Sequence, residues 1–278
     1  MMNTQAVVHI RKGEARSLKA GGMWIYDNEI ERIEGEFENG DILRVEDFDG
    51  YPLGCGFINT RSKLTVRMLS RKKDTVIDDA FIEMRVRNAW EYRRQTVDTS
   101  SCRLIFGEAD GFPGLTVDRF GQILVAQVLS LGMELRKQQL FALLLQTLHA
   151  DGAQIDAIYE RNDVKLRQKE GMEQGTGFVT LDGLRTDLDG HVTIRENGIL
   201  YDVDYIHGQK TGFFLDQKYN RRAAAQLAQG KHVLDCFTHT GSFALNAAKG
   251  GAEHVTAVDV SESAIEMARA NAARNGLE

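Results

Sequence analysis

The stretch that decides the fold is VLDCFTHTGSFALNAAKGGAEHVTAVDVS, which covers residues 233–261. An apolar run that contains Asp235 and ends at Phe237 precedes a short loop with Gly241, and a second apolar run ends at Asp259. Between them, residues 242–249 have the pattern of a helix. Strand, helix and strand at this spacing predict parallel strands joined by a right-handed crossover.

The same alternation extends on both sides of this stretch. Residues 201–205 predict a strand and residues 216–228 a helix. Residues 263–275 predict another helix, which Gly276 would end because glycine accepts the left-handed conformation after a helix.

The loop after the first strand predicts a binding site, because ligands of such sheets bind at the carboxyl ends of the strands. Asp259 follows Gly241 by 18 residues and can accept hydrogen bonds from ribose hydroxyls, which indicates an adenosine-containing ligand. The loop has one glycine where a pyrophosphate-binding loop has three. Asp235 would repel pyrophosphate but would hold the ammonium group of S-adenosylmethionine. A methyl donor is therefore favoured, with a dinucleotide or a purely structural unit as alternatives.

The first 75 residues predict a small β-barrel of short strands at 6–10, 41–46, 52–59 and 64–69, with Asp49 and Gly50 turning a hairpin. A change to helical periodicity follows, with Asp78 as the expected N-cap of a helix that ends near Val97. Further elements are expected in this central α+β region: a Gly/Pro loop at 107–114, strands joined at 120–122, a helix at 135–149 and a strand at 154–159.

The acidic total charge hides a basic segment. The 278 residues carry 34 Lys and Arg against 40 Asp and Glu, for a net charge of −6. Residues 27–49 contain ten acids and two bases, whereas residues 50–73 contain no acid and six bases, which are Arg61, Lys63, Arg67, Arg71, Lys72 and Lys73. Such a segment predicts a phosphate-binding face, although solvent-facing strand positions would also explain it.

Several protein classes are excluded by composition. The longest uncharged stretches, 121–133 and 138–150, have 13 residues each and are shorter than the ~20 of a membrane span. The first residues lack the apolar core of a signal peptide. Three separated cysteines predict neither a disulfide framework nor a zinc site, and no metal is expected. A cytoplasmic location is therefore expected, without contact to membranes.

Three further blocks accompany the deciding stretch: HGQKTGFFLDQKYNR at 207–221, GEADGFPGL at 107–115 and RNDVKLRQKEGM at 161–172. Together with DCFTHTGSFA and AVDVS, they resemble the RlmI-like class I ribosomal RNA (cytosine-5) methyltransferases over essentially the whole chain. The resemblance implies a multidomain α/β fold. It consists of a PUA-like RNA-binding β-barrel (1–75), a central α+β domain (76–195) and the N-terminal part of a Rossmann-like methyltransferase domain (196–278).

The resemblance also implies the cofactor, S-adenosylmethionine, and the partner, ribosomal RNA. Gln217 would contact the methionine portion of the donor, Phe237 would lie in the donor loop, and Asp259 would bind the ribose. The full set of expected cofactor-binding residues is Gln217, Asp235, Phe237, Thr240, Gly241 and Asp259. The expected RNA-binding residues are Lys63, Arg67, Arg71, Lys72, Arg161, Lys165 and Arg167. Core packing of Phe237 and simple exposure of Gln217 are the competing interpretations.

The catalytic residues of the family are the main departure. Carbon 5 of a pyrimidine is a poor nucleophile, so these enzymes add a Cys thiolate to carbon 6 and later remove the carbon 5 proton with a base. In the family an Asp-Pro-Pro motif and a Cys in a later loop carry this chemistry. The prolines here are Pro52 and Pro113, so the motif is missing, and Cys236 is interpreted as a buried small side chain. We expect no catalytic residue in this C-terminally truncated chain, which would be inactive alone.

Two other functions compete with this interpretation. One is a catalytically inactive RNA-binding protein with a vestigial donor domain, and the other is a nucleotide-binding oxidoreductase, which the donor loop disfavours. An incomplete parallel sheet exposes an edge and apolar helix faces. Residues 196–278 are therefore expected to be less stable than the rest, or to pair with another chain, for example in a homodimer.

Overall fold

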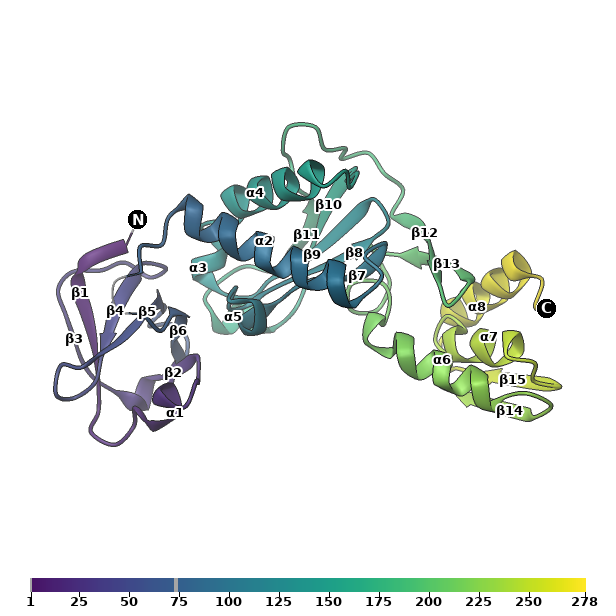
Figure 1. Ribbon diagram of the computed structural model, residues 1–278, viewed down its shortest axis with the longest axis horizontal. Helices are drawn as coiled ribbons and strands as arrows, with labels where there is room; N and C mark the ends of the chain where they lie inside the picture. The colour runs from purple at the N-terminus through teal and green to yellow at the C-terminus, as the bar shows by residue number, and fades with distance from the viewer. Residues whose placement is uncertain (1, 73–74) are drawn as a thin grey trace. The chain divides into compact units, whose positions relative to one another are not determined.

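A computed structural model describes residues 2–72 and 75–278 of the chain (Figure 1). The chain divides into two compact units. The first comprises the residues up to Val97, Arg103–Asp118 and Gln122–Thr186; the second comprises Asp98–Cys102, Arg119–Gly121 and Asp187–Glu278. Lys73 of the basic segment lies outside the described residues.

The first unit begins with a six-stranded sheet in the order β2-β6-β5-β4-β1-β3. Its strands are β1 (Met2–Ile10), β2 (Trp24–Tyr26), β3 (Ile30–Glu34), β4 (Ile42–Glu46), β5 (Pro52–Ile58) and β6 (Leu64–Ser70), with α1 (Arg16–Lys19) and the 3₁₀ turn η1 (Asp27–Glu29) between them. The four predicted strands are confirmed. Two strands were not predicted: β2, which is short, and β3, which lies in the acidic run and has no fully buried residue.

The predicted hairpin joins β4 and β5, and Asp47 organises its turn. The Oδ1 atom of Asp47 accepts hydrogen bonds from the N–H groups of Asp49 (3.1 Å) and Tyr51 (2.9 Å). Gly50 has φ = 79°, a conformation that favours glycine. The expected Asp49-Gly50 turn is thus present, with Asp47 as its main acceptor.

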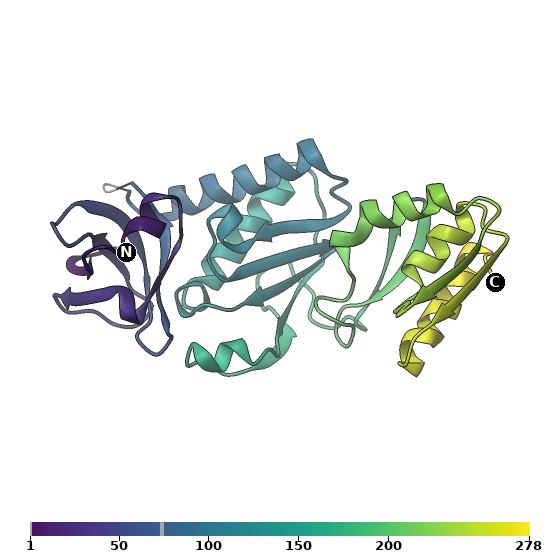
Figure 2. The same cartoon turned by 90° about the horizontal axis from the view of Figure 1, so that it is seen from below.

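The rest of the first unit is built on a five-stranded sheet in the order β11-β10-β9-β8-β7. The strands are β7 (Ser101–Phe106), β8 (Leu115–Phe120), β9 (Ile123–Val128), β10 (Ala157–Asn162) and β11 (Gly175–Phe178), and the helical segments are α2 (Asp79–Thr96), η2 (Gly107–Asp110), α3 (Leu131–Glu134), α4 (Lys137–Ala150) and α5 (Leu166–Lys169). Helices α2 and α4 pack against each other on one side of this sheet (Figure 2). Asp78 caps α2 as predicted, because its Oδ1 accepts from Phe81 N at 2.9 Å. The helix predicted for 135–149 is α4, while the short α3 before it and β11 were not predicted.

The second unit contains the predicted strand–helix–strand arrangement. Its elements are β12 (His191–Glu196), β13 (Ile199–Asp204), η3 (Leu215–Gln217), α6 (Lys218–Leu227), β14 (His232–Cys236), α7 (Ser242–Lys249), β15 (His254–Val258) and α8 (Glu262–Asn275). Strands β14 and β15 pair in parallel, with Asp235 opposite Ala257. Gly276 ends α8 at φ = 64°, as predicted. Strand β13 overlaps the strand predicted for 201–205. Strand β12 and its pairing with β13 were missed, although Asn197-Gly198, both at positive φ, is a strong hairpin signal.

Two asparagines attach α8 to the hairpin. Asn271 accepts a hydrogen bond from Asp202 N (2.8 Å), while Asn275 both accepts from Leu200 N (2.9 Å) and donates to Leu200 O (2.7 Å). An edge strand needs partners for its backbone groups. These side chains supply them, so α8 is held against β13 by polar contacts.

A buried ion pair joins the hairpin to α6. Arg221 is 0% exposed and Glu196 2% exposed, and the guanidinium contacts both carboxylate oxygens at 2.6 and 2.9 Å. Removal of one partner from such a pair leaves an uncompensated buried charge, which costs about 3–5 kcal/mol.

We therefore expect Glu196→Ala to lower the unfolding free energy of the second unit by about that amount, measured as faster hydrogen exchange in β14. Arg222→Ala, at the exposed neighbouring position, is the control. Equal exchange in the two variants would contradict this expectation.

Candidate functional site

The loop between β14 and α7 has an unusual backbone. Phe237 (φ = 62°) and His239 (φ = 53°) are two of the four non-glycine residues with positive φ in the described chain. Such conformations cost about 1–3 kcal/mol each and cluster at ligand sites. Gly241 has φ = 81°, and a Cβ there would lie 3.1 Å from the Cβ of Ala268. The loop thus has a strained, closely packed shape that the residues around it must maintain.

Asp235 connects this loop to the start of α7. Its Oδ2 accepts from Thr238 Oγ1 at 2.6 Å and from Ala244 N at 2.9 Å. Its Oδ1 has no hydrogen-bond partner within the described residues. The carboxylate therefore has one oxygen engaged in structure and one available to a further hydrogen-bond donor.

Asp259 closes the site from the neighbouring strand. Its Oδ1 accepts from Ser261 N at 3.0 Å and its Oδ2 from His239 N at 2.9 Å. These backbone N–H groups, Ser261 first and His239 next, lower the pKa of Asp259. The carboxylate thus stays ionised, with lone pairs left for hydroxyl donors.

His239 packs within the loop. Its ring meets Phe214 edge to face at 5.2 Å between centroids. Burial lowers the pKa of His239, and the nearby Asp259 carboxylate opposes that shift. The imidazole is a packing element that connects the loop to the segment before α6.

The remaining expected donor residues occupy different environments. Phe237 is 83% exposed, which excludes the core-packing alternative for it. Thr240 is buried, and its Oγ1 lacks a hydrogen-bond partner in the described structure. Gln217 is half-buried immediately before α6, where its amide contacts Asp216 and Asn220. Phe214, three residues before Gln217, contacts the ring of His239 in the donor loop. All six predicted donor residues therefore belong to one region of the second unit.

Cys236 corrects one interpretation from the sequence. It was interpreted as a buried small side chain, but it is exposed at the end of β14. Its strand is exposed in general: Leu234 is 64% exposed, and Val258 on the neighbouring strand is 49% exposed. Without covering side chains, strand residues of apolar sequence remain open to solvent.

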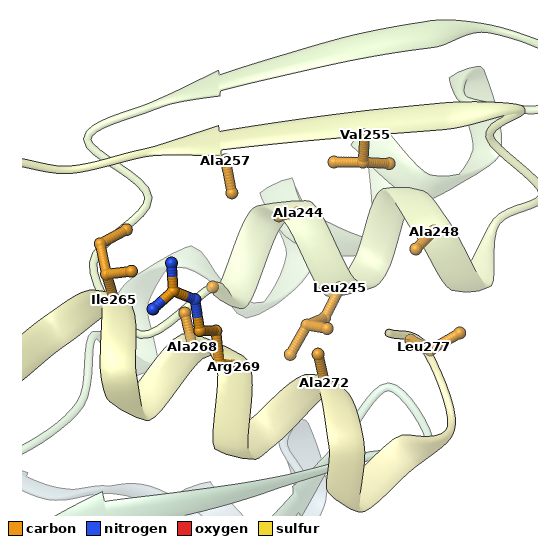
Figure 3. A pocket seen from close by; sticks show the side chains of 11 residues that line it. Ala244, Leu245, Ala248, Val255, Ala257, Ile265, Ala268, Arg269, Ala272 and Leu277 are labelled. Carbon is orange, nitrogen blue, oxygen red and sulfur yellow. The ribbon is translucent and has the colours of Figure 1, made fainter.

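An apolar hollow of about 220 Å³ lies between α7, α8 and β15 (Figure 3). Leu245, Ala268 and Ala272 point into it, and Gly241 of the donor loop also lines it. The incomplete burial expected for this sheet is visible on both strands, whereas Leu245 (4% exposed) and Ala268 (9%) of the facing helices are buried.

The seven expected RNA-binding residues separate into two groups. Lys63, Arg71, Lys72 and Lys165 are exposed. Arg67, Arg161 and Arg167 are 6–8% exposed, and each pairs with a carboxylate: Glu170 and Glu108, Asp163, and Glu134, respectively. The sequence does not reveal this difference in exposure, because Arg67 and Arg167 pair with glutamates that lie 103 and 33 residues away in the chain. As RNA contacts, all seven stay predictions.

The structure also shows features that the sequence analysis did not identify. Arg71 lines a hollow of about 480 Å³ with Lys19 and Tyr51.

Within the described residues, no group of three or more His, Cys, Asp or Glu side chains could hold a metal ion. In the same residues, no helix is both long and apolar enough to cross a membrane.

Comparison with known proteins supports the fold and the cofactor. A family described as PUA-like domain matches residues 8–71, and one described as S-adenosylmethionine-dependent methyltransferase matches residues 159–278. Two solved structures each match 100% of this chain over 68% of their own chain. One is described as a SAM-dependent methyltransferase from Streptococcus mutans (21% identity, TM-score 0.79), and the other as a methyltransferase complexed with SAH (20% identity, TM-score 0.81). The expected multidomain α/β fold and methyl-donor cofactor are thereby confirmed.

The curated relatives are named ribosomal RNA large subunit methyltransferase I. The protein of that name from Aeromonas salmonicida is 38% identical over 98% of this chain and 67% of its own length. The Pseudoalteromonas translucida protein is 37% identical over 98% and 67%, and the Escherichia coli protein 38% identical over 97% and 66%. The chain thus spans about two thirds of the length of these relatives.

The role of Asp259 can be tested by calorimetric titration with S-adenosylmethionine. Asp259→Ala removes a charged acceptor, so we expect donor affinity to fall about 10- to 100-fold. The ordinary pKa of an Asp carboxyl is about 3.9, and the pKa of Asp259 is lowered, so this carboxylate is ionised at pH 5 and above. Wild-type affinity should therefore be flat from about pH 8 to pH 5 and should decrease only below that range.

Glu262→Gln, which removes an exposed carboxylate from the first turn of α8, is the matched control and should leave affinity unchanged. Unaltered affinity in Asp259→Ala, or binding of NAD in place of S-adenosylmethionine, would contradict the assignment.

Proposed function

Because the chain belongs to the ribosomal RNA large subunit methyltransferase I family, we propose that it acts in methyl transfer from S-adenosylmethionine to carbon 5 of a cytosine in ribosomal RNA. The observation that carries the proposal is the pair of carboxylates, Asp235 and Asp259, on either side of one strained loop. A cytoplasmic location follows from this substrate. The expected homodimer stays a prediction.

The donor residues fit the parts of S-adenosylmethionine. The open Oδ1 of Asp235 suits the methionine ammonium group, and the ionised Asp259 suits the ribose hydroxyls. The unpartnered Oγ1 of Thr240 offers one more hydrogen-bonding group in the same loop. Gln217 and the backbone of Phe237 complete the proposed contacts. When bound, the donor supplies the electrophilic methyl group, and these residues bind and orient it.

RNA binding is proposed for the first unit. The exposed Lys63, Arg71, Lys72 and Lys165 would contact phosphates directly. The buried Arg67, Arg161 and Arg167 would affect phosphate binding only through the carboxylates and loops that they hold in place. Arg71 donates to the backbone oxygen of Lys19 (3.1 Å), and Lys19 lies 5.5 Å from the Tyr51 ring, so two cations and an aromatic ring share one hollow.

The chemistry at carbon 5 needs a thiolate nucleophile. Burial raises the pKa of Cys55, which keeps that thiol protonated. Cys102 is buried in the first strand of the central sheet, and Cys236 is exposed beside the donor loop. Neither the Asp-Pro-Pro motif nor a Cys in the corresponding later loop is present in the 278 residues. We propose that these residues bind donor and RNA but need the missing motifs for transfer.

This division of roles predicts that the 278-residue chain binds S-adenosylmethionine yet transfers no methyl group to unmodified ribosomal RNA. The measurement is incorporation of tritiated methyl groups, beside a full-length relative as positive control. Turnover by the 278-residue chain would refute the proposed need for the missing motifs. Donor binding without RNA binding would leave the RNA role unsupported.

Phosphate contacts predict a salt effect. Lys63→Ala and Lys72→Ala should each weaken RNA binding about equally across sequences and should each reduce the slope of log affinity against log salt concentration by about 1. Filter binding over a range of salt concentrations measures both quantities. Lys231→Ala, at an exposed position of the second unit, is the control. Identical slopes in all four proteins would exclude Lys63 and Lys72 as phosphate contacts.

A further inference from the structure

The first unit contains a hollow to which neither the donor site nor the exposed basic residues belong. It has a volume of about 370 Å³, within the ~300–1,000 Å³ of small-molecule sites. Its lining comes from β2, β6, the turn η2, the start of β8 and α5, and includes Trp24, Arg67, Phe106, Glu108 and Leu166. The N-terminal sheet and the central part of the unit thus both contribute to it.

Large apolar side chains around this hollow are open to solvent. Trp24 is 45% exposed, Phe106 55% and Leu166 43%. Trp24 lies on β2, an end strand of the six-stranded sheet, and Phe106 ends β7. Exposed aromatic rings beside a cavity are suited to stacking on a flat ligand, and nucleobases of single strands bind proteins in this way.

Two polar groups in the lining have unused hydrogen-bonding capacity. Glu108 accepts from Trp24 Nε1 (2.8 Å) and Arg67 Nη1 (3.5 Å) through Oε1, whereas Oε2 has no partner in the described chain. Arg67 is 8% exposed, and its Nε–H is buried without an acceptor among the described residues. A buried donor without an acceptor is costly. The residues that line the hollow therefore include one free acceptor and one unsatisfied donor.

The turn that carries Glu108 is held in place from behind. Asp110 forms a bidentate ion pair with Arg93 (2.6 and 2.7 Å), and its Oδ2 also accepts from Phe106 N (2.6 Å). Arg85 donates to Gly111 O at 2.6 Å, at the end of the same turn. Glu108 itself makes no contribution to these contacts. Such positioning before binding is typical of sites that recognise a ligand by hydrogen bonds.

We propose that this hollow binds one unpaired base of the RNA, a cytosine or an adenine. Both bases place an exocyclic amino group next to a ring nitrogen that accepts hydrogen bonds. The amino group would donate to Glu108 Oε2, the ring nitrogen would accept from Arg67 Nε, and the ring would stack on Trp24 or Phe106. Uracil presents a carbonyl oxygen where the amino group is needed and is excluded by repulsion from the carboxylate.

The surrounding charge suits a nucleotide. Lys165 is exposed and directly precedes Leu166, which lines the hollow, so a cation is available for the adjoining phosphate. The inference rests on the proposed function to the extent that RNA is the partner. It adds a base-selective site in the first unit, apart from the donor loop of the second.

The test uses fluorescein-labelled RNA homopolymers of about ten nucleotides, within the ~4–16 that one single-strand site covers. We expect the cytidine and adenosine oligomers to bind at least about fivefold more tightly than the uridine oligomer, measured by anisotropy. Their binding should quench Trp24 fluorescence, because Trp90, the other tryptophan, is only 6% exposed.

Three variants locate the effect. Glu108→Gln keeps an acceptor for Trp24 but places an amide donor in the site, so the preference for cytidine over uridine should disappear or reverse. Trp24→Leu should weaken binding of the cytidine and adenosine oligomers, and Trp24→Phe should restore most of it. Tyr92→Leu, an exposed aromatic on α2 outside the lining, is the control and should bind as the wild type does.

The outcomes separate this inference from the proposed function. Equal affinity of the wild type for the three oligomers, or an unchanged preference in Glu108→Gln, would overturn the base site while leaving RNA binding intact. Failure of all oligomers and of ribosomal RNA to bind at low salt would overturn both.

Discussion

Parallel pairing of β14 with β15 is the constraint on which the donor site depends. The register that places Asp235 opposite Ala257 brings the carboxyl ends of both strands to the same edge of the sheet. Asp259, one residue beyond β15, then reaches the backbone N–H of His239 in the loop after β14. That one hydrogen bond joins two loops that are about 20 residues apart in the chain. With Gly241 packed against Ala268, it maintains the positive-φ conformation of the loop.

Buried arginines perform a comparable role elsewhere in the chain. Arg221 holds the hairpin to α6, Arg93 holds the turn before β8, and Arg67 connects the N-terminal sheet with Glu170 of the central part. The planar guanidinium makes several directed hydrogen bonds at once, which suits it to joining separate elements. Positive charge that the sequence predicts for RNA contact is therefore partly used inside the protein. The proposed direct phosphate contacts are the exposed Lys63, Arg71, Lys72 and Lys165.

The elements with strong local signals were predictable. Helix α7 was predicted with the observed bounds, and the caps Asp78 and Gly276 act as expected, because capping depends on residues within one turn. The misses have equally local causes. Strand β3 is acidic and only partly buried, and α3 is a single turn of four residues, too short for a periodic pattern. The hairpin β12–β13 was missed even though Asn197-Gly198 signals it.

By itself, the sequence determined the strand–helix–strand unit and the methyl-donor cofactor, and it predicted Asp259 as the acid that binds the adenosine, because loop composition and spacing are local properties. The tertiary structure alone decided which charges are available. Arg67 and Lys63 lie in one basic segment, yet the first is buried between two glutamates and the second is exposed. It also decided that Trp24, Phe106 and Glu108 line one hollow. Those residues are up to 84 positions apart, and only packing of the sheet against the central part brings them together.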